Sequence, residues 1–179
     1  MPTNWASPSS SSSARTGATK CMLEIKNKII ERFDANTNGG HDSEGMILEH
    51  CVIGVLDLST IEFHGKVTIR NCIIDKLDLH CTWFAAGLEF TGNIIMSDID
   101  YQMGGHNNEE MIISDNIFHG FFDFFDCHFE NKLTVENNIF MKGTDLILRE
   151  NKGFDNYFHG GVILSGNIGK LNVWPDFSF

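Results

Sequence analysis

Positive charge, long apolar runs and paired cysteines are all scarce in this sequence. Lys and Arg number 13 against 24 Asp and Glu, which gives a net charge of −11. This balance argues against a direct nucleic-acid binder, which would need a basic surface, and against an anionic membrane as partner. No stretch reaches the roughly 20 apolar residues of a membrane-spanning helix. We therefore expect that the protein neither binds nucleic acid directly nor associates with a membrane.

Sequence motifs for catalysis and metal binding are missing as well. The five cysteines form neither a CxxC pair nor a zinc-ligand spacing, so we expect reduced thiols and a cytoplasmic location. The chain has no nucleophile elbow and no phosphate loop. These absences predict a protein that is not an enzyme and that holds neither a cofactor nor a metal ion.

The first 20 residues differ from the rest of the chain. Positions 7–13 contain six Ser and one Pro, and the segment has neither periodicity nor the apolar core of a secretory signal. We expect residues 1–20 to be a disordered tail and residues 21–179 to form a single domain. An apolar content of 42% is sufficient for a core in a domain of this size.

An eight-residue pattern, seen most clearly from Val67 to Ile74, recurs along this domain. Its first and third residues are apolar, its sixth is usually Cys or Asn, and its eighth is usually Ile or Phe. Successive units are 21–29 residues apart and open at Leu23, Met46, Val67, Leu88, Met111, Leu133 and Val162. A period near 22 is too short for helix-pair repeats, and the alternation puts the first and third residues on one face of a strand.

A second, looser unit begins 9–13 residues after most of these openings and often ends in Phe. Two strand units per period predict an all-β fold, a parallel β-helix (β-solenoid) of about seven coils of about 22 residues. Stacking at roughly 4.8 Å would make a rod about 34 Å long. Residues 23–33 fit either a first coil or a capping helix. A polar segment from Gly104 to Glu110 is expected to bulge outward.

The sixth position of the repeat predicts a structural ladder inside the rod. Stacked amides can hydrogen bond along the axis at a bend, and Cys fits the same column as a small apolar residue. The column consists of Cys51, Cys72, Asn93, Asn116, Asn138 and Asn167.

The pattern resembles the pentapeptide-repeat proteins over about residues 23–173. Apolar residues step by five through Leu48, Ile53, Leu58 and Phe63, and Asp57 precedes one of them as it often does in that family. The resemblance implies a right-handed, four-sided β-helix. Some members of the family mimic DNA, so an acidic DNA mimic is one expectation. The strand-Asn-Ile/Phe pattern is also similar to β-helices of the pectate-lyase type, which is our second choice.

One carboxylate per coil is predicted to project from the second unit. The ladder consists of Asp57, Asp78, Asp100 and Asp123. It could hold a divalent cation, present an acidic face to a protein partner, or simply be solvated. The leading hypothesis is a non-catalytic structural or protein-interaction module of unknown partner, with a homodimer through an end coil as an option.

The alternative is a small carbohydrate-binding or polysaccharide-cleaving β-helix. Cleavage would require converging carboxylates, with Asp100 and Asp123 as candidates and Arg149 one coil beyond. The surface discriminates between the hypotheses. A concave groove with exposed aromatic residues near these aspartates favours a sugar ligand, whereas a flat acidic wall favours a protein partner.

Overall fold

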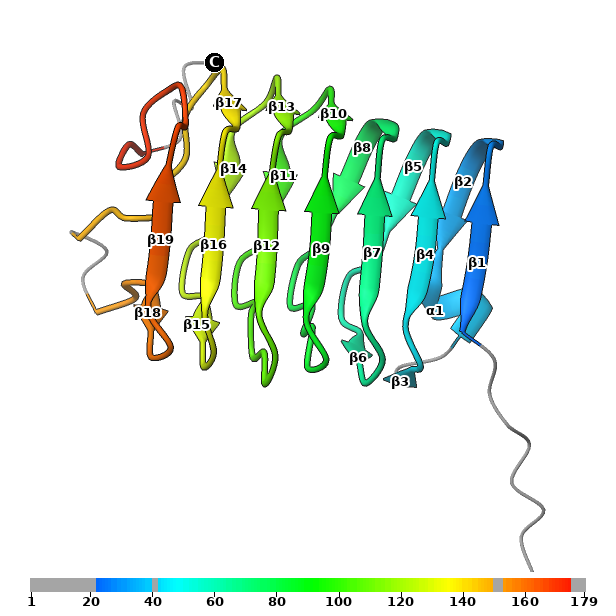
Figure 1. The fold of residues 1–179 in the computed structure, drawn as a ribbon, viewed down its shortest axis with the longest axis horizontal. Coiled ribbons are helices and arrows are strands. Elements are labelled where there is room, and N and C mark those ends of the chain that lie inside the picture. Colours follow the sequence, from blue (N-terminus) through cyan, green and yellow to red (C-terminus); the bar gives the residue numbers. More distant parts are fainter. Residues whose placement is uncertain (1–21, 40–41, 150–152, 175–179) are drawn as a thin grey trace, which may run out of the picture.

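A computed structural model describes residues 22–39, 42–149 and 153–174. The chain winds as a β-solenoid of parallel strands, with the N-terminal coil at one end of the rod and β19 at the other (Figure 1). The chain ascends through one sheet and descends behind it while advancing along the rod, so the coils are right-handed (Figure 1). The predicted fold class is confirmed. The predicted tail at residues 1–20 lies outside the described residues.

The first unit of each repeat forms one wall of the rod, a seven-stranded parallel sheet. Every strand of this sheet begins at the first residue of a repeat unit. The strands, in spatial order, are β1 (Leu23–Lys26), β4 (Met46–Glu49), β7 (Val67–Arg70), β9 (Leu88–Thr91), β12 (Met111–Ser114), β16 (Leu133–Glu136) and β19 (Val162–Ser165). Equivalent residues are direct neighbours, as Ile69 and Phe90 show. The repeat therefore set the register.

The end of the first unit and the start of the second together form an eight-stranded parallel sheet on another wall. Its strands are β2 (Ile29–Asp34), β5 (Val52–Asp57), β8 (Ile73–Asp78), β10 (Ile94–Ile95), β11 (Ile99–Asp100), β13 (Ile117–Phe118), β14 (Phe122–Asp123) and β17 (Ile139–Phe140). From β10 onward, each longer strand of this wall gives way to two short ones. A bend separates the two short strands, at residue 97 between β10 and β11 and at residues 119–120 between β13 and β14.

A third wall is made of short pairings. Its strands are β3 (Asp42–Ser43), β6 (Glu62–Phe63), β15 (His128–Phe129) and β18 (Tyr157–Phe158). Single bridges through Trp83 and Gly105 connect β6 to β15. The helix α1 (Ala35–Gly39) interrupts the first coil, and the last coil is incomplete. About five coils are complete, fewer than the seven predicted, because the two end strands of the seven-stranded sheet belong to partial coils.

The structure decides two expectations, one for residues 23–33 and one for residues 104–110. Residues 23–33 form β1 and β2, so they are a first coil rather than a capping helix. The expected outward bulge at 104–110 is wrong. Gly105 bridges Trp83 and His128 in the wall, and its N–H donates to the buried Tyr101 hydroxyl at 2.9 Å. That bond holds the segment against the core.

The predicted Cys and Asn column is an internal ladder. Asn116 accepts hydrogen bonds at Oδ1 from the backbone N–H of Asn93 at 2.8 Å and from its side-chain amide at 3.1 Å. Its own Nδ2 donates to the carbonyl of Phe90 at 2.8 Å. Asn138 and Asn167 repeat the arrangement on the following coils. The ladder thus satisfies buried backbone groups where the chain bends.

Cys72 and Cys51 continue the column toward the N-terminal end. The N–H of Cys72 donates to Oδ1 of Asn93 at 2.9 Å, and the N–H of Cys51 approaches Sγ of Cys72 at 3.4 Å. Both thiols are free, and burial raises the pKa of Cys72 to about 11. These cysteines therefore act as small packing residues with weak acceptor sulfurs. No helix in the described parts of the chain is long and apolar enough to span a membrane.

Candidate binding groove and acidic ladder

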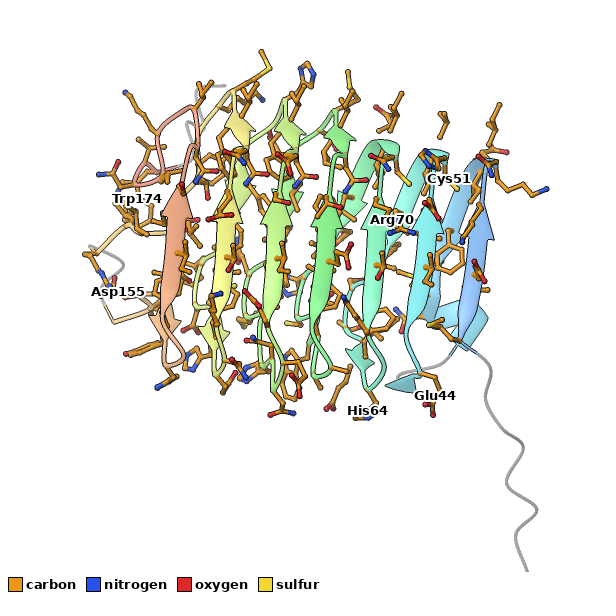
Figure 2. All side chains as sticks on the ribbon, in the orientation of Figure 1. Glu44, Cys51, His64, Arg70, Asp155 and Trp174 are labelled. Atoms are coloured by element: carbon orange, nitrogen blue, oxygen red, sulfur yellow. The ribbon has the colours of Figure 1, made fainter. Side chains whose placement is uncertain are left out.

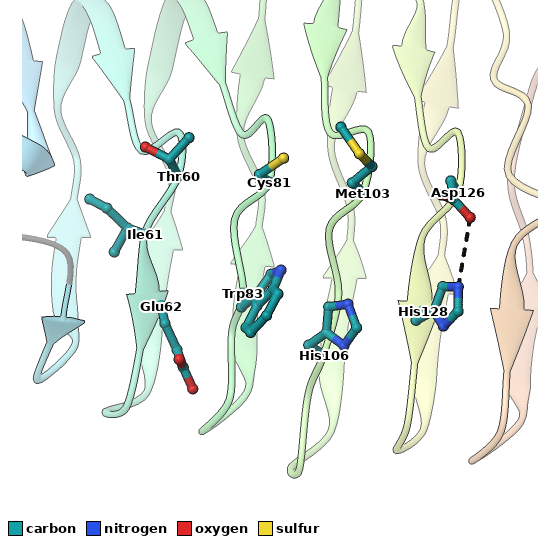
Figure 3. A pocket seen from close by; sticks show the side chains of 9 residues that line it. All are labelled: Thr60, Ile61, Glu62, Cys81, Trp83, Met103, His106, Asp126 and His128. Carbon is teal, nitrogen blue, oxygen red and sulfur yellow. Dashed lines mark ion pairs between the residues drawn. The ribbon is translucent and has the colours of Figure 1, made fainter. Parts of the chain in front are cut away.

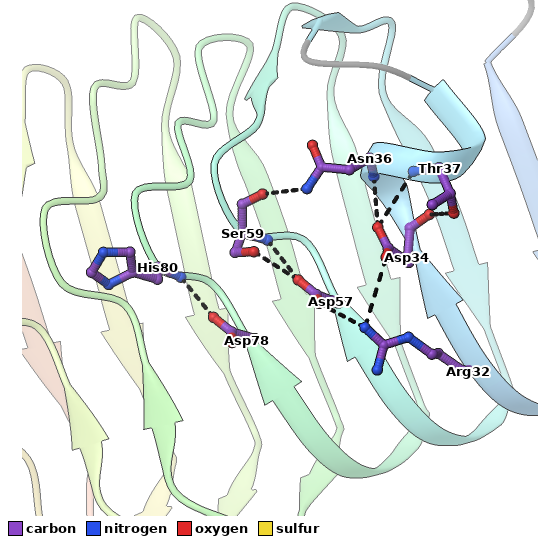
Figure 4. Close-up of polar contacts among 8 residues, drawn as sticks. All are labelled: Arg32, Asp34, Asn36, Thr37, Asp57, Ser59, Asp78 and His80. Carbon is purple, nitrogen blue, oxygen red and sulfur yellow. Dashed lines mark hydrogen bonds and ion pairs between the residues drawn. The ribbon is translucent and has the colours of Figure 1, made fainter.

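The predicted acidic ladder lies in register along the second wall. Asp57, Asp78, Asp100 and Asp123 pair successively through β5, β8, β11 and β14, and Asp34 pairs with Asp57 below them. In every member of the predicted ladder, Oδ1 accepts a hydrogen bond from the backbone N–H two residues later, at 3.0–3.3 Å. Figure 4 shows this contact for Asp57 and Asp78. Each carboxylate therefore caps the turn that follows its strand.

Neighbouring coils supply further partners to these carboxylates. Nη2 of Arg32 lies 3.0 Å from Oδ2 of Asp57. Nε2 of Gln102 donates to Asp123 at 2.7 Å, and Nδ1 of His80 lies 3.1 Å from Asp100. Within residues 22–39, 42–149 and 153–174, no group of three or more His, Cys, Asp or Glu could hold a metal ion. The ladder is thus a row of turn caps tied together between coils.

Asp145 extends this arrangement by one coil, and the sequence analysis did not select it. Its side chain is buried, and Oδ1 accepts a hydrogen bond from the N–H of Phe124 at 2.7 Å. Burial, together with the nearby Asp123 carboxylate, raises the pKa of Asp145 to about 7. An internal carboxyl of this kind is sensitive to pH in the neutral range.

A shallow groove of about 600 Å³ lies on the third wall (Figure 3). It crosses several coils and so runs along the rod. Its lining residues are Thr60, Ile61, Glu62, Cys81, Trp83, Met103, His106, Asp126 and His128. Because every coil contributes equivalent positions, the groove has a repeating lining.

One side of the groove is a row of turn residues that have left-handed backbone conformations. Thr60, Cys81, Met103 and Asp126 have φ between 52° and 58°. Each stands three residues after a ladder aspartate, in the turn which that aspartate caps. The β-branched Thr60 is unusual at positive φ. The turns that the ladder aspartates cap therefore form one side of the groove.

The other side of the groove is an aromatic row. Trp83 and His106 have ring centroids 4.4 Å apart, His106 and His128 lie 5.6 Å apart, and His128 and Tyr157 lie 4.8 Å apart. Trp83 is 39% exposed and Tyr157 is 45% exposed. Trp83, His106 and His128 thus present rings to the groove on consecutive coils (Figure 3), and Tyr157 continues the row beyond the lining.

Strand alternation places these rings outside. Phe63, Phe84, Phe129 and Phe158 point into the core and stack in pairs, at 5.6 Å for the first two and 5.4 Å for the last two. The residue before each of them must then face outward, and these residues are Glu62, Trp83, His128 and Tyr157. The sequence analysis missed the groove, although the recurring Phe at the end of the second unit marked it. His106 joins the row from beside the Gly105 bridge.

The charged side chains at the groove are mainly acidic. Glu62 and Asp126 line it, and Nδ1 of His106 contacts Glu130 at 3.0 Å. The lining includes no Lys or Arg. Two nearby lysines are already paired, Lys66 with Glu89 at 2.9 Å and Lys132 with Glu110 at 2.8 Å. The groove therefore lies in a negative field.

The residues predicted as candidates for polysaccharide cleavage are separate from the groove. Asp100 and Asp123 do not line the groove, although the turns that they cap do. Arg149 does not line it either. Comparisons with models of protein families, with curated proteins and with solved structures found no match to this chain.

Proposed function

We propose that this protein is a non-catalytic β-solenoid that binds a linear carbohydrate along the groove of the third wall. The aromatic row of Trp83, His106, His128 and Tyr157 carries the proposal. Sugar rings have apolar C–H faces that pack on flat aromatic rings, while their hydroxyls bond to polar side chains. A groove that combines exposed rings with a few polar groups suits such a ligand.

The repeat spacing suits an extended ligand rather than a compact one. Parallel strands recur at roughly 4.8 Å, so the row from Trp83 to Tyr157 spans about 14 Å in three steps. Each coil offers an equivalent ring to the next part of the ligand. A polymer lying parallel to the rod would contact all of these coils at once.

The spacing of carboxylates in the groove supports binding without cleavage. Glycoside hydrolysis uses two carboxyl groups at most about 9.5 Å apart. The lining carboxylates Glu62 and Asp126 lie three coils apart, which corresponds to roughly 14 Å. Asp100 and Asp123, the candidates for cleavage, cap turns outside the lining. A non-enzymatic module is therefore the better proposal.

Within the β-helices, we propose the pentapeptide-repeat type. Four inward residues separated by five positions are all buried in one coil: Leu48, Ile53, Leu58 and Phe63. The residue two before each of them is buried as well, as Met46 and Cys51 illustrate. This inward pair, repeated every five residues, supports the assignment. The free thiols of the neighbouring Cys51 and Cys72 support the proposal of a reducing, cytoplasmic location.

The second candidate function is recognition of a protein partner by the acidic ladder. The in-register alignment of Asp57, Asp78, Asp100 and Asp123 favours it. Its charge density favours a protein partner over DNA mimicry, because one carboxylate per ~4.8 Å is sparse beside one charge per ~1.7 Å in duplex DNA. Capture from a cell extract that is lost in a variant with all four Asp→Asn changes would support this function.

Glycan-array binding followed by calorimetry tests the carbohydrate proposal. We expect a linear oligosaccharide to bind the wild-type protein and to lose at least ten-fold in affinity with Trp83→Ala. The matched control is Trp174→Ala, because Trp174 is also exposed but lies beyond β19 at the end of the rod (Figure 2). Absence of binding to every linear glycan, or equal losses in the two variants, would refute the proposal.

A further inference from the structure

We infer that the groove selects glycans that carry free amino groups over neutral glycans and excludes those built from uronic acids. The inference rests on the proposed carbohydrate function and adds the charge of the ligand. Its basis is the distribution of charged side chains at the groove, which is independent of the aromatic row that carries the proposed function.

Acidic side chains occur at both ends of the groove lining. Glu62 lies one coil before Trp83, and Asp126 lies beside His128 with its Oδ1 3.7 Å from Nε2. Glu130 adds a third carboxylate next to His106. These side chains are 28–42% exposed, so an ammonium group of a ligand can reach them from solvent.

No Lys or Arg lines the groove. Glu62, Glu130 and Asp126 contact His64, His106 and His128, respectively, and these histidines carry charge only when protonated. Lys66 and Lys132 are bound to Glu89 and Glu110, so their charges are locally neutralised. A uronate chain would bring its own carboxylates against Glu62 and Asp126 without meeting a Lys or Arg of the lining. The whole-chain charge of −11 adds to the repulsion.

The expected preference follows from Coulomb's law. An ammonium group about 5 Å from one carboxylate gains roughly four-fold in affinity in water-like surroundings. Two such contacts give roughly ten- to twenty-fold for an amine-bearing oligosaccharide over its N-acetylated counterpart. Because the groove is open to solvent, this preference should weaken as salt is added.

The test compares three 1,4-linked hexasaccharides at pH 6 by calorimetry: β-linked glucosamine, β-linked N-acetylglucosamine and α-linked galacturonic acid. We expect glucosamine to bind at least ten-fold more tightly than N-acetylglucosamine, and galacturonic acid not to bind. Equal binding of the first two, or tighter binding of the uronate, overturns the inference but leaves the carbohydrate proposal standing. If none of the three binds, the inference fails, and the carbohydrate proposal is decided by the glycan array. A lysine hexapeptide that binds as tightly as glucosamine also overturns it.

Two carboxylate variants test whether Glu62 and Asp126 cause the preference for the amino sugar. Glu62→Gln and Asp126→Asn should each lower the affinity for glucosamine about four-fold and leave that for N-acetylglucosamine unchanged. Asn tolerates the left-handed conformation of Asp126, so this change preserves the turn. The control is Asp75→Asn, at an exposed aspartate outside the groove. Losses no larger than that of the control would contradict the inference.

Discussion

Replacement of Asn116 by Ala tests the internal ladder most directly. The side chain is fully buried, and its amide both accepts from Asn93 and donates to the carbonyl of Phe90. Truncation leaves the buried N–H of Asn93 and the carbonyl of Phe90 without these partners. An unsatisfied buried group costs about 1–3 kcal/mol, so we expect a loss of about 3–4 kcal/mol in the free energy of unfolding.

The chain itself provides a graded variant. At the equivalent position, Sγ of Cys72 lies 3.4 Å from the N–H of Cys51. Asn116→Cys should therefore keep an acceptor for Asn93, lose the bond to Phe90 and cost roughly half as much as Asn116→Ala. Asn108→Ala, at an exposed site, should change the free energy of unfolding by less than about 0.5 kcal/mol.

Urea unfolding followed by circular dichroism gives the free energies of the three variants. The expected order of destabilisation is Asn116→Ala, then Asn116→Cys, then Asn108→Ala. A loss below about 1 kcal/mol for Asn116→Ala, or one equal to that of Asn108→Ala, would refute the idea that amide bonding between coils holds the bend together.

Three further predictions concern other positions. Because burial raises the pKa of Asp145 to about 7 from the ordinary value of 3.8, its contribution to stability is complete below about pH 4 and falls by about 4 kcal/mol as the pH rises through 7. Asp145→Asn should therefore flatten the pH profile of urea unfolding between about pH 4 and 7, and Asp75→Asn should not. A Cβ at Gly120 would lie 2.2 Å from the backbone N of Asp98, so Gly120→Ala should cost at least 2 kcal/mol in thermal unfolding. Gly161→Ala meets no atom within 4 Å and should cost about 1 kcal/mol through its positive φ alone; equal costs would refute the overlap. Asp78→Asn should leave the melting temperature within about 2 °C of wild type, because Asn can also cap the turn at His80, and a larger drop would show that the carboxylate charge is needed.

The ladder residues show how far local sequence rules reach. Asp57 and Asp78 were correctly aligned from their spacing, since a repeat of about 22 residues places equivalent side chains above each other. Their roles as turn caps were missed, because an outward carboxylate and a cap have the same position in the repeat. Only the turn geometry shows which backbone N–H the carboxylate accepts from.

The sequence by itself determined the winding of the chain. Apolar alternation and the Cys and Asn column specified which side chains face inward, and burial of those side chains leaves one register for the coils, as the pairing of Ile69 with Phe90 shows. The tertiary structure alone decided the groove. Trp83 and His128 each precede an inward Phe, but no repeat position marks His106, so the contact of the three rings depends on the stacking of coils and on the Gly105 bridge. Inward positions repeat because they must fill a common core. Outward positions are free to vary, and they form a binding surface only where the stacked coils bring them together.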